Sequence, residues 1–358
     1  MMNTKKILFA ALAAAAFTAC KKNSDPNIIL TSTASSGSAS IQFNGLVGSE
    51  PGSSAGNSVY LDFSTEKTTT ALRSGWDLGF YSGSDFRVIL NNTTSAGAKV
   101  IAKFDLNSVV AADTIGLTLS TSQTNPQPTD LAYFDNISGD INQTVIPAVS
   151  ATDAANPVII LNRGTGGSTP ARAWVKLRVL RNGSNGYTVQ YAGILETTYH
   201  TYTIAKDPTF NFQYLSFQNG QVSVEPEKVK WDLVWSYSVY QADFGTGLVP
   251  YNFSDLIAVN YLAGVQVKQM VYADANTAAA AYTAFNRDSV NTNPTLTGKW
   301  TIGSSWRSTQ PATGARLDRF YLVKDANGNY YKFKCLAMGV GADGGTRGKP
   351  QFKYTLIP

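Results

Sequence analysis

Cysteine, histidine and methionine are scarce in this 358-residue chain, which contains two, one and four of them, respectively. No cysteine spacing matches a zinc or iron–sulfur site. Cys335, the one cysteine beyond residue 20, has no partner for an internal disulfide. Because Cys335 lies in the apolar–polar alternation of residues 331–336, we predict a buried, inert strand thiol rather than a reactive one. The sequence predicts no structural metal site.

Charged residues and long apolar runs are also few. The 29 lysines and arginines stand against 24 aspartates and glutamates, and this near balance predicts no nucleic-acid partner. After residue 20, no apolar run approaches the roughly 18 residues that a transmembrane helix needs. The rest of the chain is therefore expected to lie outside the lipid.

Signals of catalysis are weak. A Ser-His-Asp triad would have to use His200, which lies in an apparent strand alternation. Asp77 and Asp232 each follow a tryptophan, and this recurrence favours a structural hydrogen bond at a strand end over catalysis. Carboxylate pairs of the kind that hydrolyse glycosides meet only in three dimensions, so a hydrolase stays open as an alternative. We expect a binding protein and not an enzyme.

Residues 1–20 have the form of a lipoprotein signal peptide. A cationic start at 1–6 precedes an uncharged run at 7–17, and residues 17–20 read Phe-Thr-Ala-Cys, as in a lipobox. This pattern predicts lipid attachment at Cys20 and an outer-membrane lipoprotein that faces the periplasm or the cell surface. The alternative is an ordinary signal peptide with a chance cysteine. Residues 21–40 are rich in Ser, Thr and Ala and predict a flexible tether.

Strand patterns dominate the remaining sequence and predict a mostly β fold. Residues 58–63, 86–90 and 174–180 alternate apolar with polar residues or are rich in β-branched and aromatic residues. One helix is expected, at 274–285, where four consecutive alanines occur.

The body also repeats itself. Residues 60–63 read Tyr-Leu-Asp-Phe and lead to Trp76, while residues 214–217 read Tyr-Leu-Ser-Phe and lead to Trp231. Each half ends in a hairpin with an Asn/Gly turn, the first after residues 174–177 and the second after 320–323. We therefore predict two tandem antiparallel β-rich domains of related topology, at 41–205 and 210–358.

This order of elements resembles the HmuY haemophore family of Bacteroidetes lipoproteins. The similar elements are the tyrosine-bearing strand, the Trp-Asp-Leu strand, the Gly-containing stretch at 95–98, the hairpin at 320–334 and the final turn and strand at 344–356. The resemblance covers 210–358 more fully than 45–205. It implies an antiparallel β fold at the surface or in the periplasm, and capture of haem by two axial His or Met side chains on loops.

The chain departs from this family in its axial ligands. Haem iron takes His, Met, Cys or Tyr, yet residues 271–316, where the resemblance would place a pair, contain neither His nor Met. Met270 and Tyr272 at the edge of this region are the candidate donors, and packing is the alternative role of Met270. Met338 and His200 are expected to be a packing residue and a surface strand residue.

Large rings in a polar segment are the remaining candidates for a binding site. Trp300, Trp306 and Arg307 lie within residues 299–307, where exposed rings would stack on a porphyrin or a sugar. The alternative is that these rings cover the end of a β sandwich. The main hypothesis is capture of haem or another planar or apolar ligand without the axial pair. A glycan-binding or adhesive surface lipoprotein without a haem function is the alternative.

Overall fold

The structure is a computed structural model and describes residues 37–245 and 247–358. The predicted leader, with Cys20, and residues 21–36 of the predicted tether lie outside this range. The described residues belong to one compact unit in which antiparallel sheets dominate, so the predicted mostly β fold is confirmed. Among the described residues, no helix is long and apolar enough to cross a membrane.

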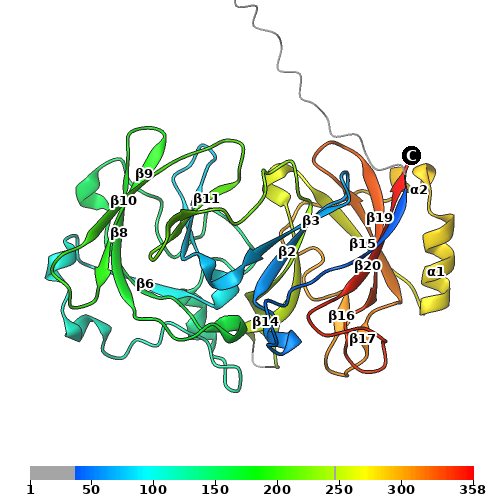
Figure 1. The fold of residues 1–358 in the computed structure, drawn as a ribbon, viewed down its shortest axis with the longest axis horizontal. Coiled ribbons are helices and arrows are strands. Elements are labelled where there is room, and N and C mark those ends of the chain that lie inside the picture. Colours follow the sequence, from blue (N-terminus) through cyan, green and yellow to red (C-terminus); the bar gives the residue numbers. More distant parts are fainter. Residues whose placement is uncertain (1–36, 246) are drawn as a thin grey trace, which may run out of the picture. The chain divides into compact units, whose positions relative to one another are not determined.

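One five-stranded antiparallel sheet comes entirely from the first half of the chain (Figure 1). Its strands lie in the order β10 (His200–Ala205), β9 (Gly186–Gly193), β8 (Val175–Arg181), β7 (Val158–Asn162) and β6 (Gly97–Ile101). The pair β8–β9 is the hairpin expected from the first Asn/Gly turn. Leu161, Leu177 and Val189 are fully buried in the core beside this sheet.

A second five-stranded sheet joins the two ends of the described chain. Its order is β1 (Ser38–Gln42), β20 (Gln351–Ile357), β19 (Tyr330–Ala337), β18 (Arg319–Lys324) and β15 (Gln266–Val271). The pair β18–β19 is the second expected hairpin. Cys335 is buried in β19, and burial raises the pKa of its thiol well above the ordinary value, as expected for an inert strand thiol.

Two helices pack beside this second sheet. Helix α1 (Ala275–Ala284) begins after Asp274, whose side chain accepts the N–H of Thr277, and it ends before Phe285. The helix predicted at 274–285 is therefore confirmed. The shorter helix α2 (Arg287–Asn291) was not expected from the sequence. Tyr282 and Phe285 pack against Phe320 of β18, which fixes the helical segment to the sheet.

The two remaining four-stranded sheets each combine hairpins from both halves of the chain. One sheet has the order β14 (Leu248–Val259), β13 (Leu233–Asp243), β2 (Asn57–Asp62) and β3 (Lys67–Leu72). The other has the order β12 (Gly220–Val222), β11 (Phe212–Ser216), β4 (Leu78–Tyr81) and β5 (Val88–Leu90). A small pair, β16 (Arg307–Ser308) and β17 (Gly314–Ala315), completes the strands of the described residues.

Each half of the chain thus contributes one hairpin that pairs with a strand of the other half, and we call this arrangement the hairpin exchange. Hairpin β2–β3 pairs with β13, and hairpin β11–β12 pairs with β4, so Figure 1 shows β2 and β3 beside β14. The predicted domains 41–205 and 210–358 share these two sheets. That the two segments are copies of one domain stays a prediction.

A tryptophan–tyrosine pair lies at each of the two places where a hairpin of one half pairs with a strand of the other. The ring of Trp76 meets the ring of Tyr214 edge-on, with centroids 4.9 Å apart, and Trp231 meets Tyr60 in the same way at 5.0 Å. Each tryptophan therefore packs against the tyrosine of the other half. Such edge-to-face contacts contribute about 0.5–1.5 kcal/mol beyond burial.

Two buried aspartates hydrogen-bond to the exchanged hairpins. Asp77 accepts the backbone N–H of Phe217 at 2.8 Å, and Asp232 accepts the backbone N–H of Phe63 at 2.8 Å. The expectation of a structural hydrogen bond at a strand end is therefore confirmed for both residues. Since each bond links one half to a hairpin of the other, both acids stabilise the exchange.

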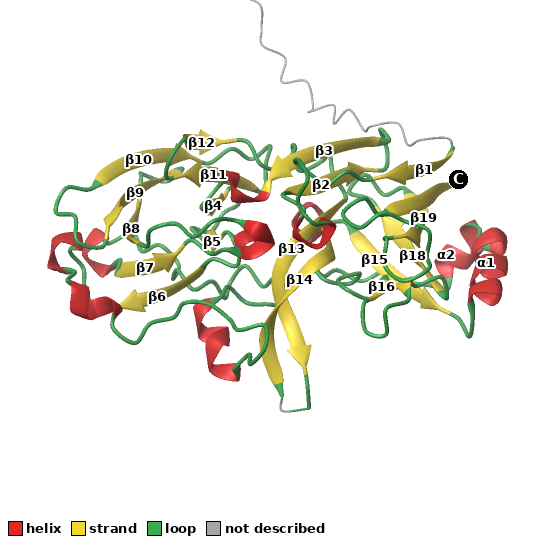
Figure 2. Ribbon diagram, turned by 60° about the horizontal axis from the view of Figure 1, so that its bottom comes forward, coloured by secondary structure: helices red, strands yellow, loops and turns green. Residues whose placement is uncertain are grey.

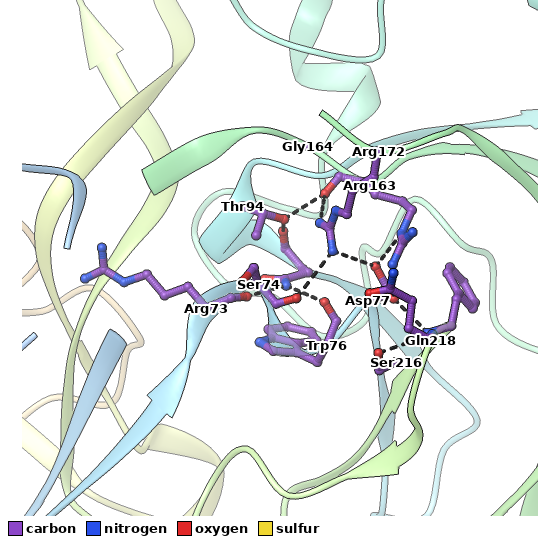
Figure 3. A network of polar contacts seen from close by, with 12 residues as sticks. Arg73, Ser74, Trp76, Asp77, Thr94, Arg163, Gly164, Arg172, Ser216 and Gln218 are labelled. Carbon is purple, nitrogen blue, oxygen red and sulfur yellow. Dashed lines mark hydrogen bonds and ion pairs between the residues drawn. The ribbon is translucent and has the colours of Figure 1, made fainter. Parts of the chain in front are cut away.

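The two aspartates differ in charge partners. Figure 3 shows Arg163 and Arg172 converging on Asp77. Arg163 donates two hydrogen bonds to Asp77, at 2.8 and 2.9 Å, and Arg172 donates one at 3.3 Å. Asp232 has no ion pair within the described part of the chain. Burial raises the pKa of Asp232 well above its ordinary value.

Candidate functional site

A series of aromatic rings runs along the hairpin formed by β13 and β14, which projects beyond the neighbouring strands in Figure 2. Tyr240 and Tyr251 are direct partners across the two strands. Side chains two residues apart on a strand share a face, so Phe253 lies on the same face as Tyr251. We call Tyr240, Phe244, Tyr251 and Phe253 the hairpin rings.

The hairpin rings form a continuous chain of contacts. Ring centroids lie 5.3 Å apart for Phe244 and Tyr251, 5.4 Å for Tyr251 and Phe253, and 6.0 Å for Tyr240 and Phe253. The chain continues to Trp300, whose ring centroid is 5.3 Å from that of Tyr240. These separations fall in the range of favourable aromatic pairs, so the rings hold one another in place.

The hairpin rings are only partly removed from water. Phe244 is 61% exposed and the adjacent Leu248 is 50% exposed, whereas Tyr240, Tyr251 and Phe253 are half-buried. A group of contacting apolar side chains that stays exposed is typical of a binding surface. The rings offer flat faces and edges on which a planar molecule would stack.

Cationic side chains lie beside the rings. The guanidinium of Arg307 lies 5.6 Å from the centroid of the Phe253 ring, and the Lys299 ammonium lies 5.0 Å from that of Trp300. Burial lowers the pKa of both groups, while the negative charges of Asp255 and Asp135 oppose this effect at Arg307 and Lys299, respectively. The site therefore combines apolar ring faces with positive charge, which suits a planar ligand that carries acidic groups.

Two of the five predicted binding residues belong to this site. Trp300 extends the chain of hairpin rings, and Arg307 contacts Phe253. The structure places Trp306 instead in the core, with no exposed surface. Its indole N–H donates to the carbonyl oxygen of Asp255 at 2.9 Å. Trp306 is therefore a core residue.

Met270 and Tyr272 lie at a different place. Both are partly buried in the cluster beneath α1 and α2, where the Tyr272 ring stacks on Phe320 with centroids 5.6 Å apart. Met338 is buried in the main core. His200 is exposed on β10, and its ring stacks on that of Tyr191 at 5.3 Å, as expected for a surface strand histidine.

Axial donors at the hairpin rings are limited to phenols. The four rings and Trp300 include no His, Met or Cys, so only the hydroxyls of Tyr240 and Tyr251 belong to the residue types that ligate haem iron. Within the described residues, no group of three or more His, Cys, Asp or Glu side chains is arranged to hold a metal ion. The residues present therefore fit the porphyrin plane better than they fit the iron.

The sequence analysis missed the hairpin rings, although the sequence contains a signal for two of them. Tyr251 and Phe253 stand two residues apart in Leu248–Val259, the alternation that places side chains on one face of a strand. Their contact with Tyr240 depends on the pairing register of β13 and β14, and that register becomes visible only in the structure.

The described residues thus form a mostly antiparallel β fold that carries exposed, contacting rings on one hairpin. Residues 208–354 match the family model described as HmuY protein, so this part of the chain is HmuY-like. The hairpin rings, Trp300 and Arg307 all lie within the matched residues. No curated protein and no solved structure matches the chain.

Proposed function

We propose that the protein is a non-enzymatic, lipid-anchored binding protein that captures haem or another planar, apolar molecule on the hairpin rings. The observation that carries this proposal is the chain of contacting, partly exposed rings within the HmuY-like residues. Stacking and apolar burial supply the affinity, and Arg307 and Lys299 attract acidic groups at the edge of the ligand.

The mode of haem binding follows from the missing axial pair. A tyrosine oxygen from Tyr240 or Tyr251 is the donor that we propose at this site, because Met270 and Tyr272 pack beneath the helices. With no imidazole or thioether beside the rings, haem binds weakly and without a low-spin, six-coordinate spectrum.

A titration of the purified protein with haemin, followed at the Soret band, tests the function. We expect saturable binding that weakens roughly tenfold or more in the double variant Tyr251→Ala and Phe253→Ala, since each lost ring contact contributes about 0.5–1.5 kcal/mol. Tyr199→Ala removes an exposed ring outside the hairpin and is the matched control. It leaves the affinity for haemin unchanged.

Two results would contradict haem capture at the rings. The first is tight binding with a low-spin, six-coordinate spectrum that the double variant does not alter. The second is no change of the Soret band at any haemin concentration. In the second case, retardation of the protein by an immobilised polysaccharide, lost in the double variant, would assign the same rings to glycan binding, because sugars also stack on exposed rings.

The membrane anchor is part of the proposal. HmuY proteins are surface-associated, and lipid attachment at Cys20 would place this chain at the outer membrane, facing the periplasm or the cell surface. We expect labelled palmitate to enter the native protein and not the variant Cys20→Ser. Equal labelling of the two would rule out this anchor.

A further inference from the structure

A cavity of about 140 Å³ is lined by residues of the two four-stranded sheets that combine hairpins from both halves of the chain. Residues from both sheets and from the loops between them line it, among them Tyr60, Trp76, Tyr214, Glu225, Trp231 and Trp300. This volume is close to that of an engineered apolar cavity of about 150 Å³ that holds benzene. The cavity is therefore large enough for one six-membered ring and too small for a porphyrin.

Aromatic rings form part of the cavity wall. Both tryptophan–tyrosine pairs of the hairpin exchange take part, Trp76 with Tyr214 and Trp231 with Tyr60. The two rings of each pair stand nearly perpendicular, at 79° and 86°. Four aromatic rings thus border the space that an aromatic guest would occupy, and aromatic rings pair favourably in stacked or edge-to-face arrangements.

One polar group at the cavity has no partner. Trp231 is only 8% exposed, and its indole N–H is buried without a hydrogen bond to any described residue. A buried donor left unpaired costs about 1–3 kcal/mol. An acceptor atom on a bound molecule would remove this cost.

The acid at the cavity is a second potential donor. Glu225 is 7% exposed, and its carboxylate oxygens accept from the backbone N–H of Phe212 at 2.7 Å and the hydroxyl of Tyr214 at 3.3 Å. Burial raises the pKa of Glu225 to about 8, against the lowering effect of these hydrogen bonds. At pH 7 the carboxyl group therefore keeps its proton, and it places little negative charge in the cavity.

We propose that this cavity binds a neutral molecule with one six-membered ring and one hydrogen-bond acceptor, which receives the indole N–H of Trp231. Lys299 and Asp135 also line the cavity, but their opposite charges interact with each other. A charge on the bound molecule would therefore be buried without a free counter-charge, which is far more costly than burying a neutral acceptor. The hairpin rings do not line the cavity, but Trp300 and Lys299 do, so the cavity adjoins the proposed planar-ligand site and is a second site beside it.

Two probes of equal shape test the proposal. Acetophenone carries a carbonyl oxygen where α-methylstyrene carries a methylene group, and both have the same number of heavy atoms. In calorimetric titrations of the full-length protein at pH 7, we expect acetophenone to bind about tenfold more tightly, which corresponds to one hydrogen bond. Trp231→Phe removes the N–H and should abolish this preference, so that the two probes bind this variant equally well.

Trp235→Phe is the matched control. Its indole N–H is also buried without a partner, but Trp235 does not line the cavity, so the preference for acetophenone should persist. A second variant, Ala258→Val, narrows the cavity and should weaken both probes. Haemin binding should stay unchanged in Trp231→Phe, which separates this test from that of the hairpin rings.

Several outcomes would overturn the proposal. These are no binding of either probe, equal binding of the two probes by the native protein, and loss of the preference in Trp235→Phe as well as in Trp231→Phe. Unchanged affinity of both probes in Ala258→Val would also overturn it, and this variant serves if Trp231→Phe does not fold.

Discussion

At the residue scale, the same amino acid at corresponding positions has different electrostatic surroundings. Asp77 and Asp232 both accept a backbone N–H from the exchanged hairpin of the other half. Two arginines form ion pairs with Asp77, whereas Asp232 has no ion pair within the described residues and burial raises its pKa well above the ordinary value. The tertiary structure therefore determines the electrostatic surroundings of each acid.

The effect of Asp→Asn substitutions should differ between the two positions. Asp77→Asn leaves Arg163 and Arg172 largely buried without a counter-charge, so we expect a loss of roughly 3–5 kcal/mol in the free energy of unfolding. Asp232→Asn keeps an oxygen acceptor for the N–H of Phe63 and breaks no ion pair within the described residues, so it should cost less than about 1 kcal/mol. Denaturant unfolding of both variants measures this. Equal losses would show that the ion pairs of Asp77 with the two arginines do not account for its contribution to stability.

Glu225 should make stability depend on pH. Its pKa is raised from 4.5 to about 8 in the folded protein. The stabilisation associated with the bound proton is fully present below about pH 4.5, decreases as pH rises towards 8, and is lost above that value.

The variant Glu225→Gln isolates this contribution. Asp135, whose pKa burial raises to about 6, has the same sign of dependence and stays in both proteins. Between pH 5 and 8, the native protein should lose on the order of 4 kcal/mol more than the variant does. Unfolding free energies at several pH values test this, and parallel curves for the two proteins would show that Glu225 ionises normally.

At the scale of elements, local sequence patterns predicted individual hairpins and a helix, whereas the pairing register of the strands determined which side chains come together. Hairpins β8–β9 and β18–β19 and helix α1 form where the sequence places Asn/Gly turns and an alanine run. The hairpin rings depend instead on the pairing of β13 with β14, which sets Tyr240 opposite Tyr251. A shift of one residue would turn one set of rings to the other face.

At the scale of the whole molecule, the exchange of hairpins makes each half depend on the other. The fully buried Leu61 of β2 pairs with Leu233 of β13, and Leu215 of β11 pairs with Leu78 of β4. Separating the halves would expose these side chains and the edges of β13 and β4, which become free to aggregate.

We therefore expect neither half to fold as a stable monomer when residues 37–205 and 208–358 are produced separately. Produced together, they should form a one-to-one complex that unfolds cooperatively. Size-exclusion chromatography and thermal unfolding measure both properties. Cooperative unfolding of either isolated half as a monomer would show that the exchange is not essential.

The sequence alone determined the mostly β composition, the helix at 274–285, the buried thiol of Cys335 and the structural role of Asp77 and Asp232. These features depend on short-range periodicity, turn residues and composition, which neighbouring residues encode. It also indicated Trp300 and Arg307 as candidate binding residues, but it could not show that Trp306 is buried, because a polar segment does not reveal which ring lies in the core.

Only the tertiary structure decided which hairpin pairs with which strand. The Tyr-Leu-Asp-Phe strand at 60–63 and the Tyr-Leu-Ser-Phe strand at 214–217 carry similar patterns, so either would fit beside β4 or β13 on local grounds. Contacts between residues far apart in the chain, such as Trp76 with Tyr214 and Trp231 with Tyr60, select the exchanged arrangement. The cavity lined by these four rings exists because of that choice.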